Sequence, residues 1–422
     1  MKPVSNFQKQ VHKASKSLPS VKYNQIRWAY VNCLEHVGRR LKRGLITCLE
    51  CNYSWIDKTT EKFCICPNCA TKLSIYDTIK SKFSDSQYCC YITTCKGFQV
   101  LRFFYISVTG KVGNRPLYDH YEVVQRWIAP NGKHVTFAKL RLTMCWDLTW
   151  SQSSNLEIRN NHPVYNINPI RVYPSFKIIP ELKRCGFDGN CYHIPPFNLI
   201  QTLLSENRAE TLFKAHQIEL LKHFINNGFD TLKEFWSSIK ICFRNNYNVP
   251  DASLWCDYIE LLSFFDKDTR NAKYVCPADL IAEHDKYVLK KRDWQKQQDR
   301  EKAKRKAAQD NHLFNELKSR FFGIEFTDGL IQVRVLDSSE DVMIEGDTLH
   351  HCLFTNKYHL KPDTLLFSAF IGDKRLETVE VSLSLLKVIQ CRGACNQNTE
   401  YHHRIIKLVN KNVPLIQKRL SA

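Results

Sequence analysis

The chain has 422 residues, a formal net charge of +19 and a hydrophobic share of 43%. This composition is typical of a folded globular protein and excludes an intrinsically disordered one, and the length allows two to four domains. No stretch approaches the run of about 20 apolar residues that a membrane helix needs, and the polar start of the chain lacks the apolar segment of a secretory signal. We therefore expect a cytoplasmic protein without a membrane partner.

The charge and the cysteines indicate what such a protein contacts. An excess of 61 Lys and Arg over 42 Asp and Glu creates a positive field, and nucleic acid is the common intracellular polyanion, so DNA or RNA is the expected partner. The alternative is a solvated basic surface that aids solubility. The 18 cysteines include the vicinal pair Cys89–Cys90. Together with the missing signal, this favours free thiols and a metal site in a reducing compartment over disulfides.

The first 47 residues carry ten Lys and Arg against one acid, Glu35. Apolar residues at helical spacing predict an amphipathic helix with a basic face from about Tyr23 to Arg43. The end of this segment holds the candidates for phosphate contacts, which are Arg39, Arg40, Lys42 and Arg43.

Two CxxC pairs follow in the run TCLECNYSWIDKTTEKFCICPNCATKL. Cys48 and Cys51 are separated by 14 residues from Cys66 and Cys69, a spacing that predicts a closed four-cysteine zinc site of the zinc-ribbon type. Such a site is structural, because protein ligands fill all four positions. Cys64 is a competing ligand, although the pair that begins at Cys66 has the better spacing. Zinc ribbons serve as nucleic-acid modules and also as plain structural staples.

The rest of the chain divides by periodicity. Strand-like runs rich in Val, Ile, Phe and Tyr, with the turn signal NGK at 131–133, predict a small antiparallel sheet between about Gly97 and Tyr173. Helical apolar stripes follow from about Pro196 to Asp285. The segment from Lys286 to Lys306 has ten Lys and Arg, three acids and neither Pro nor Gly, which predicts a long exposed helix. That helix is either a solvated connector or a nucleic-acid arm.

The C-terminal run from Glu345 carries a motif. Its members are His351-Cys352, Tyr358, Glu380, Gln390-Cys391-Arg392-Gly393 and Asn396. This pattern resembles the PcfJ-like family, which is named after a protein of conjugative plasmids and is found mostly on bacterial mobile elements. The resemblance covers about 60 residues and implies membership of that family and possible protein partners from a mobile element. It implies no particular reaction.

The same residues also suggest a site by their geometry. Asp347 is a good N-cap for a helix running to about Thr355, which would contain Cys352. His351 and its neighbour His350 cannot face Cys352 on a helix, so its base would come from His359 or Glu380. The strand period of two places Glu380 opposite Gln390 across a hairpin, with Arg392 nearby. We expect these three side chains to face one concavity, with Cys352 and a histidine at its rim.

Three interpretations of this C-terminal site remain open. It is a structural hydrogen-bond network, a ligand or nucleic-acid site, or a catalytic site made of His351, Cys352, Glu380, Gln390 and Arg392. A catalytic site would use either metal-assisted phosphodiester chemistry through Glu380 or thiol chemistry through Cys352. For the whole protein, the functions considered are a nucleic-acid-associated accessory protein of a mobile element, an enzyme of hydrolase or nuclease type, and a zinc-stabilised interaction scaffold.

The expected fold class is α+β with several domains. The predicted parts are a basic amphipathic helical segment at 1–47, a zinc-ribbon-like module at 48–75, a small β-rich domain at 90–175, a helical region at 190–285, a charged connector helix at 286–312 and a C-terminal PcfJ-like domain at 313–422.

Overall fold

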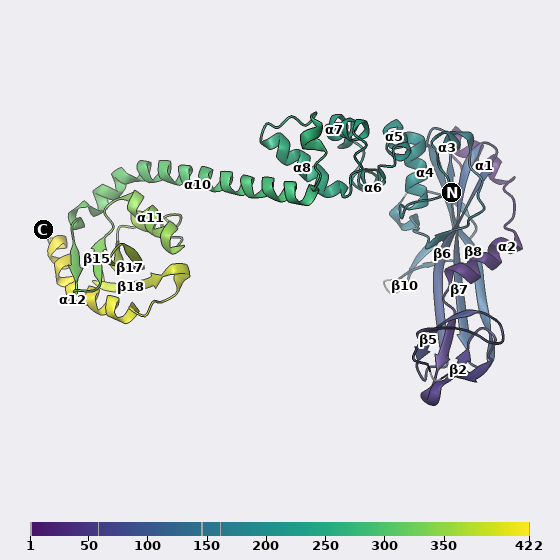
Figure 1. The fold of residues 1–422 in the computed structure, drawn as a ribbon, viewed down its shortest axis with the longest axis horizontal. Helices are drawn as coiled ribbons and strands as arrows, with labels where there is room; N and C mark the ends of the chain where they lie inside the picture. The colour runs from purple at the N-terminus through teal and green to yellow at the C-terminus, as the bar shows by residue number, and fades with distance from the viewer. Residues whose placement is uncertain (1, 58, 145–146, 161, 422) are drawn as a thin grey trace. The chain divides into compact units, whose positions relative to one another are not determined.

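The computed structural model describes residues 2–57, 59–144, 147–160 and 162–421, and its internal contacts divide the chain into two units, 1–284 and 285–422. Helices and several separate sheets occur together, so the expected α+β class is confirmed (Figure 1). No helix in the described part of the chain is long and apolar enough to cross a membrane.

The first unit begins with two short helices and a five-stranded sheet. The helices are α1 (Asn6–Ser15) and α2 (Tyr23–Cys33). The sheet has the order β3-β2-β1-β5-β4, and only β1 and β5 pair in parallel. Its strands are β1 (Val37–Arg40), β2 (Leu45–Cys48), β3 (Ser54–Ile56), β4 (Phe63–Ile65) and β5 (Lys72–Asp77), with the 3-10 turn η1 (Lys42–Gly44) between the first two. We call this sheet and its loops the cysteine module, residues 37–77.

The predicted helix from Tyr23 to Arg43 is therefore too long. The helix ends at Cys33, and the chain then enters the sheet as β1. Gly38 lies in this strand between β2 and β5, where there is little room for a side chain. A Cβ at Gly38 would lie 2.5 Å from Cδ1 of Ile75. Glycine also weakens a helix by about 1 kcal/mol relative to alanine. The pairing of β1 with β2 and β5 therefore outweighs the helical spacing of the apolar residues before it. As a result, Arg39 and Arg40 belong to the cysteine module rather than to a helix face.

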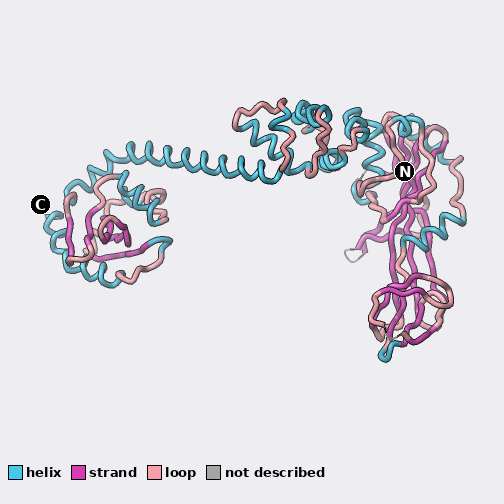
Figure 2. Tube along the Cα trace, in the orientation of Figure 1, coloured by secondary structure: helices cyan, strands magenta, loops and turns pink. Residues whose placement is uncertain are grey.

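Three long strands form the centre of the second sheet (Figure 2). Its order is β12-β9-β8-β7-β6-β13. The strands are β6 (Lys82–Cys95), β7 (Phe98–Lys111), β8 (Asn114–Ile128), β9 (His134–Ala138), β12 (Glu157–Arg159) and β13 (Arg171–Val172), and β10 (Arg141–Met144) pairs separately with β11 (Asp147–Trp150). The hairpin predicted at NGK is confirmed between β8 and β9, with Gly132 at φ 78°. The sheet starts before the predicted Gly97, because β6 pairs with β7 along its full length.

The cysteine module packs on the hairpin that joins β7 and β8. Nδ2 of Asn52 donates to the carbonyl of Asn114 at 2.6 Å, and the N–H of Gly113 donates to Oδ1 of Asn52 at 2.7 Å. Leu49 fills the space above Gly110, where a Cβ would come within 3.3 Å. These contacts attach the module to the end of the long strands.

Helices complete the first unit, as the apolar stripes predict. The core contains buried side chains from these helices, namely Leu220, Phe224, Phe235, Ile239 and Trp255. The helices are α3 (Pro180–Arg184), α4 (Pro196–Ser205), α5 (Asn207–Lys214), α6 (Ile218–Asn227), α7 (Leu232–Arg244), α8 (Ala252–Phe264) and α9 (Ala272–Val275). The expected charged helix is α10 (Leu280–Lys318), which is longer at both ends than 286–312.

The second unit contains a five-stranded antiparallel sheet with helices on both faces, and Phe314 near the end of α10 packs on one of these faces. Its order is β14-β15-β16-β17-β18. The elements are β14 (Glu325–Thr327), β15 (Gln332–Val335), α11 (Ser339–Leu349), β16 (Thr364–Ile371), β17 (Lys374–Ser382), β18 (Lys387–Gly393) and α12 (His402–Ser421). Val379 and Val381 on β17 pack with Ile405 and Val409 of α12 in one core. The opposite face of β17 is left for polar side chains.

Candidate functional site

The four cysteines of the predicted zinc site occupy two loops with the same backbone geometry. In the first, the N–H of Asn52 donates to the carbonyl of Cys48, and Asn52 has a φ of 60°. In the second, the N–H of Ala70 donates to the carbonyl of Cys66, and Ala70 has a φ of 56°. Each loop thus turns sharply after its second cysteine. This repeated turn points both pairs of thiols toward one centre.

The distances between the sulfur atoms fit a tetrahedral metal ion. All four Sγ atoms lie within 4.8 Å of one another. The Sγ atoms of Cys48 and Cys69 are 3.8 Å apart, and those of Cys51 and Cys66 are 3.6 Å apart. Zn–S bonds of about 2.3 Å in a tetrahedron place the sulfur atoms about 3.8 Å from one another. The four predicted ligands can therefore hold a metal ion without rearrangement.

The thiols of this cluster differ in their environment. Burial raises the pKa of Cys48. Burial acts in the same direction on Cys51, but hydrogen bonds with Asn68 and the backbone of Tyr53 outweigh it and lower its pKa to about 7. Cys64 lies on β4 opposite Leu73 and is not one of the four converging thiols. The competition from Cys64 that the sequence left open is thus not supported by the geometry.

The predicted phosphate-binding residues of this module are not equivalent. Arg40 makes a two-pronged ion pair with Asp77, at 2.7 and 2.9 Å, and donates to the carbonyls of Thr59 and Glu61. It therefore holds strands β1 and β5 to the loop between β3 and β4. Lys42 and Arg43 lie on the turn η1, and Arg43 is exposed. Nε of Arg39 is buried without a hydrogen-bond partner among the described residues.

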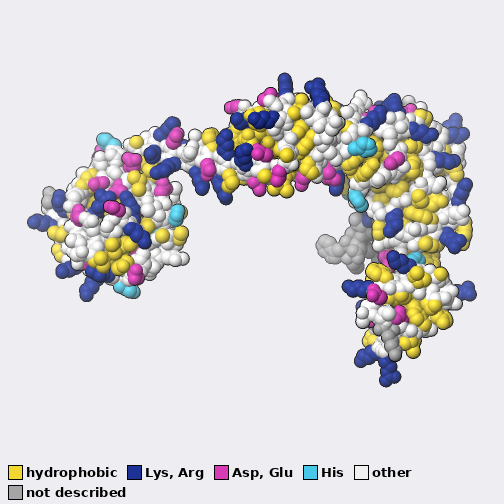
Figure 3. All heavy atoms as spheres, in the orientation of Figure 1, with side chains coloured by type: hydrophobic (Ala, Val, Ile, Leu, Met, Phe, Trp, Pro, Cys, Tyr) yellow, Lys and Arg dark blue, Asp and Glu magenta, His cyan; other side chains and the backbone are white. Residues whose placement is uncertain are grey.

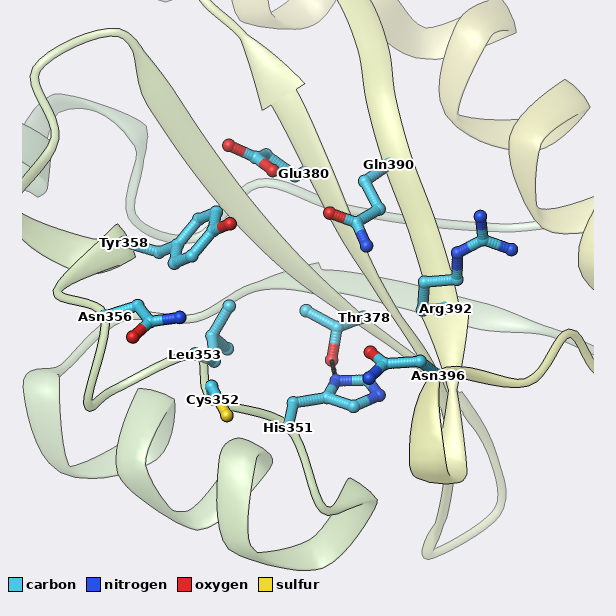
Figure 4. A pocket seen from close by; sticks show the side chains of 10 residues that line it. All are labelled: His351, Cys352, Leu353, Asn356, Tyr358, Thr378, Glu380, Gln390, Arg392 and Asn396. Atoms are coloured by element: carbon cyan, nitrogen blue, oxygen red, sulfur yellow. Dashed lines mark hydrogen bonds between the residues drawn. The ribbon is translucent and has the colours of Figure 1, made fainter. Parts of the chain in front are cut away.

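The second unit contains a cavity of about 350 Å³ at the C-terminal motif (Figure 4). All five residues of the predicted catalytic set line it, together with Leu353, Asn356, Tyr358, Thr378 and Asn396. The register places Glu380 opposite Gln390 and Thr378 opposite Arg392, as the period-two pattern predicted for Glu380 and Gln390. A one-residue bulge at Ile389 produces this register, because Val381 pairs with Val388 on the turn side of the bulge and Glu380 pairs with Gln390 beyond it.

Glu380, Gln390 and Arg392 make no hydrogen bond with one another in the described chain. Glu380 is half-buried and accepts a hydrogen bond from Oγ1 of Thr364 at 3.1 Å. Arg392 donates to Oδ1 of Asn398 at 2.6 Å instead of to Glu380, and Figure 4 shows its guanidinium turned away from Tyr358. Gln390 is exposed. The pocket therefore presents a carboxylate without an ion-pair partner in the described chain.

The helix predicted from Asp347 to Thr355 is also wrong. α11 begins after Ser338, whose hydroxyl caps Asp341, and ends at Leu349 with His350 in the left-handed conformation at φ 53°. Cys352 consequently lies beyond the C-terminal end of a helix. The first turn of α11, where a helix dipole stabilises an anion, therefore lies far from Cys352 along the chain.

The histidines near Cys352 have separate roles. Nε2 of His351 lies 2.6 Å from the carbonyl of Gly393 and donates to it, while Nδ1 lies 3.4 Å from Oγ1 of Thr378. His359 is buried, stacks on Phe354, and has a pKa lowered by burial. It does not line the pocket, so the base proposed for Cys352 is not His359.

Two buried carboxylates beside the pocket were not singled out from the sequence. Glu345 of α11 accepts hydrogen bonds from Ser368 and Thr378, both at 2.7 Å, and pairs with Arg375. Thr378 in turn contacts His351. The signal was present in the sequence, because Glu345 falls on the inward face of α11, three residues after the buried Val342.

The other carboxylate, Glu377, meets Cys391 and His402 on the core side of the sheet. Its Oε2 lies 2.8 Å from Sγ of Cys391 and 2.7 Å from Nδ1 of His402, and its Oε1 accepts the N–H and hydroxyl of Thr399, both at 2.6 Å. These are hydrogen-bond distances, shorter than the roughly 3.4 Å between ligands around a tetrahedral zinc ion. Glu377 therefore acts as a hydrogen-bonded anchor for the start of α12.

Part of the chain also resembles a known family. Residues 254–406 match the model of PcfJ-like proteins. This PcfJ-like region begins in α8, includes α10, and contains every residue that lines the C-terminal pocket. It leaves out the cysteine module and the six-stranded sheet. No curated protein and no solved structure matches the chain.

Proposed function

We propose that the protein is a nucleic-acid-associated accessory protein of a bacterial mobile element, with a structural zinc ion in the cysteine module. The observation that carries the proposal is the charge of +19, to which the first 47 residues contribute ten Lys and Arg against one acid. On the face drawn in Figure 3, Lys and Arg side chains are spread over both units. A field of this sign attracts phosphates through the release of counterions.

Three further observations support parts of this proposal. The resemblance of residues 254–406 to PcfJ-like proteins supports the mobile-element setting. The all-thiol ligand set and its spacing support zinc, since soft thiolates in a tetrahedron suit that ion. All 17 described cysteines are free, which supports the reducing cytoplasm as the compartment.

The proposal is tested by binding labelled single-stranded DNA, duplex DNA and RNA over a salt series. We expect affinity to fall steeply with salt. A variant with Arg39, Lys42 and Arg43 changed to Ser should bind with a salt slope that is smaller by about 2 to 3 units. Arg40 stays in place because its ion pair holds the fold. The matched control changes Lys407, Lys411 and Lys418 of α12 to Ser. Absence of binding at low salt would contradict the proposal.

A second candidate function is catalysis in the C-terminal pocket, favoured by the gathering of His351, Cys352 and Glu380 at one cavity. Such catalysis would use thiol chemistry through Cys352, which is exposed, or metal-assisted chemistry through Glu380. Cys352→Ser and Glu380→Gln should then abolish the biological function without lowering the melting temperature. If both keep full function, the pocket is not catalytic. The remaining alternative is a zinc-stabilised scaffold. It predicts that the protein binds no nucleic acid and that Cys352→Ser and Glu380→Gln keep the biological function.

A further inference from the structure

A second, larger cavity lies in the first unit, between α2, the cysteine module and β8. Its volume is about 780 Å³, more than twice that of the C-terminal pocket. The value falls within the range of about 300–1,000 Å³ that is typical of ligand sites. The second cysteine loop, including the metal-ligand candidate Cys69, forms part of its wall. The cavity therefore depends on the folded cysteine module.

Three cations line this cavity from three different elements. Arg27 comes from α2, Lys72 from β5 and Arg171 from β13, and all three are exposed. None of them forms an ion pair with a carboxylate in the described part of the chain. Their charges are consequently available to an anionic ligand.

The acidic side chains of the cavity are already engaged by neighbouring groups. Glu35 accepts a hydrogen bond from the hydroxyl of Tyr76 at 2.9 Å. Glu50 contacts Nδ1 of His36 at 2.9 Å and accepts a hydrogen bond from Tyr118. Nε2 of His36 is buried and has no hydrogen-bond partner among the described residues. The lining thus combines two hydrogen-bonded carboxylates, a histidine and three cations that form no ion pair with a carboxylate in the described chain.

Aromatic rings supply the remaining surface. Phe63 is 60% exposed on the edge strand β4, with Nζ of Lys72 5.7 Å from its ring centroid. Tyr30 packs against Tyr118 at a centroid distance of 4.6 Å. Exposed rings beside unpaired cations are the features with which proteins bind single-stranded nucleic acid, because bases stack on the rings while cations contact the backbone.

We infer that this cavity binds single-stranded nucleic acid, with Arg27, Lys72 and Arg171 contacting phosphates and Phe63 stacking on a base; this inference rests on the proposed function. A single strand fits better than a duplex, since the faces of paired bases are covered by their stacked neighbours and cannot reach a ring inside a cavity. The site lies apart from the turn at Lys42 and Arg43, so the two surfaces can be tested separately.

The charge arm of the test uses a fluorescein-labelled oligothymidylate and a duplex of equal length with the full-length protein. The triple variant Arg27→Gln, Lys72→Gln and Arg171→Gln should reduce the salt slope for the single strand by about 2 units, since each phosphate contact contributes about 0.7. The control changes Lys9 and Lys13 of α1 and Lys16, which follows its last residue, to Gln; this removes the same charge from exposed positions outside the cavity. It should leave the slope unchanged.

The stacking arm compares Phe63→Ala with Ile65→Ala. Both side chains are exposed on β4, 60% and 68%, and only Phe63 lines the cavity. Phe63→Ala should weaken single-strand binding about tenfold and duplex binding much less, while Ile65→Ala changes neither. If the wild-type protein binds nucleic acid and both cavity variants bind it with the same affinity, this inference is wrong and the proposed function still stands. Wild-type protein that binds no nucleic acid would overturn both.

Discussion

Single residues on β17 show how the chain builds polar contacts on both faces of one strand. Glu377 faces the core, and its neighbour Thr378 faces Glu345 on the other side. The side chains of Glu345 and Glu377 are both fully buried. A buried carboxylate is costly unless hydrogen bonds replace its water, and each of these two accepts several. The strand thus joins α11 and α12 to the sheet through two carboxylates.

Glu377 makes stability depend on pH. Burial raises its pKa, but hydrogen bonds with Cys391, Thr399 and His402 outweigh it and lower the pKa below the usual value. Because the folded state prefers the charged form, its stabilisation is present above the unfolded pKa of about 4.3 and is lost as the pH falls through the lower folded value.

Glu377→Gln should therefore lower the free energy of unfolding by about 2 kcal/mol at pH 7, because four donors lose a charged acceptor. The difference from wild type should shrink as the pH drops below about 4. Denaturant unfolding at several pH values measures both effects. The exposed Glu400 provides the control, since Glu400→Gln should change nothing. A difference that does not depend on pH would contradict the assigned role.

Arg40 gives a second prediction at this scale. Its ion pair with Asp77 and its bonds to two carbonyls connect three segments of the cysteine module. Arg40→Ala should lower the melting temperature of the first unit, whereas Arg43→Ala on the exposed turn should not. Thermal melts of both variants provide the measurement. Equal melting temperatures would mean that Arg40 is as dispensable to the fold as Arg43.

Elements were predicted with different success, for physical reasons. The pairing of Glu380 with Gln390 agrees with the prediction from the period of two, but it depends on the bulge at Ile389, which the alternation pattern alone does not reveal. The helix through Cys352 was misplaced because Asp347 is a good cap in isolation, whereas Ser338 caps α11 nine residues earlier. A local capping signal shows where a helix can begin. It does not show at which of two such residues the helix begins in the packed protein.

The cysteine loops show the opposite case, in which spacing alone located the site. Cys48, Cys51, Cys66 and Cys69 converge because each loop turns identically after its second cysteine. Arg40 could not be recognised as a structural residue, since its partner Asp77 lies 37 positions away. The cluster at Glu377 likewise depends on contacts between three separate elements.

Metal binding should be inseparable from folding of the cysteine module. The purified protein should carry about one zinc ion per chain, and Cys48→Ser or Cys69→Ser should lose the ion and unfold the module, because binding energy here is folding energy. Elemental analysis and circular dichroism provide the readouts. Cys64→Ser is the control and should retain both metal and structure. Full metal retention in Cys48→Ser would refute the assigned ligands.

At the scale of the whole molecule, composition indicated a basic multidomain protein but not which residues share one surface. The net charge is a sum over the chain, and the cavity between α2 and the cysteine module unites residues as distant as Arg27 and Arg171. The exposed apolar side chains of the module include Phe63, Ile65 and Tyr76. Only the assembled first unit shows that cations and rings share one surface.

The most direct test of the central claim is photo-cross-linking of the full-length protein to a single-stranded oligonucleotide, followed by mass spectrometry of the linked peptides. We expect cross-links within residues 1–172, concentrated on α2 and the cysteine module, and their loss when a chelator removes the metal. Cross-links confined to residues 285–422, or none at low salt, would contradict the account.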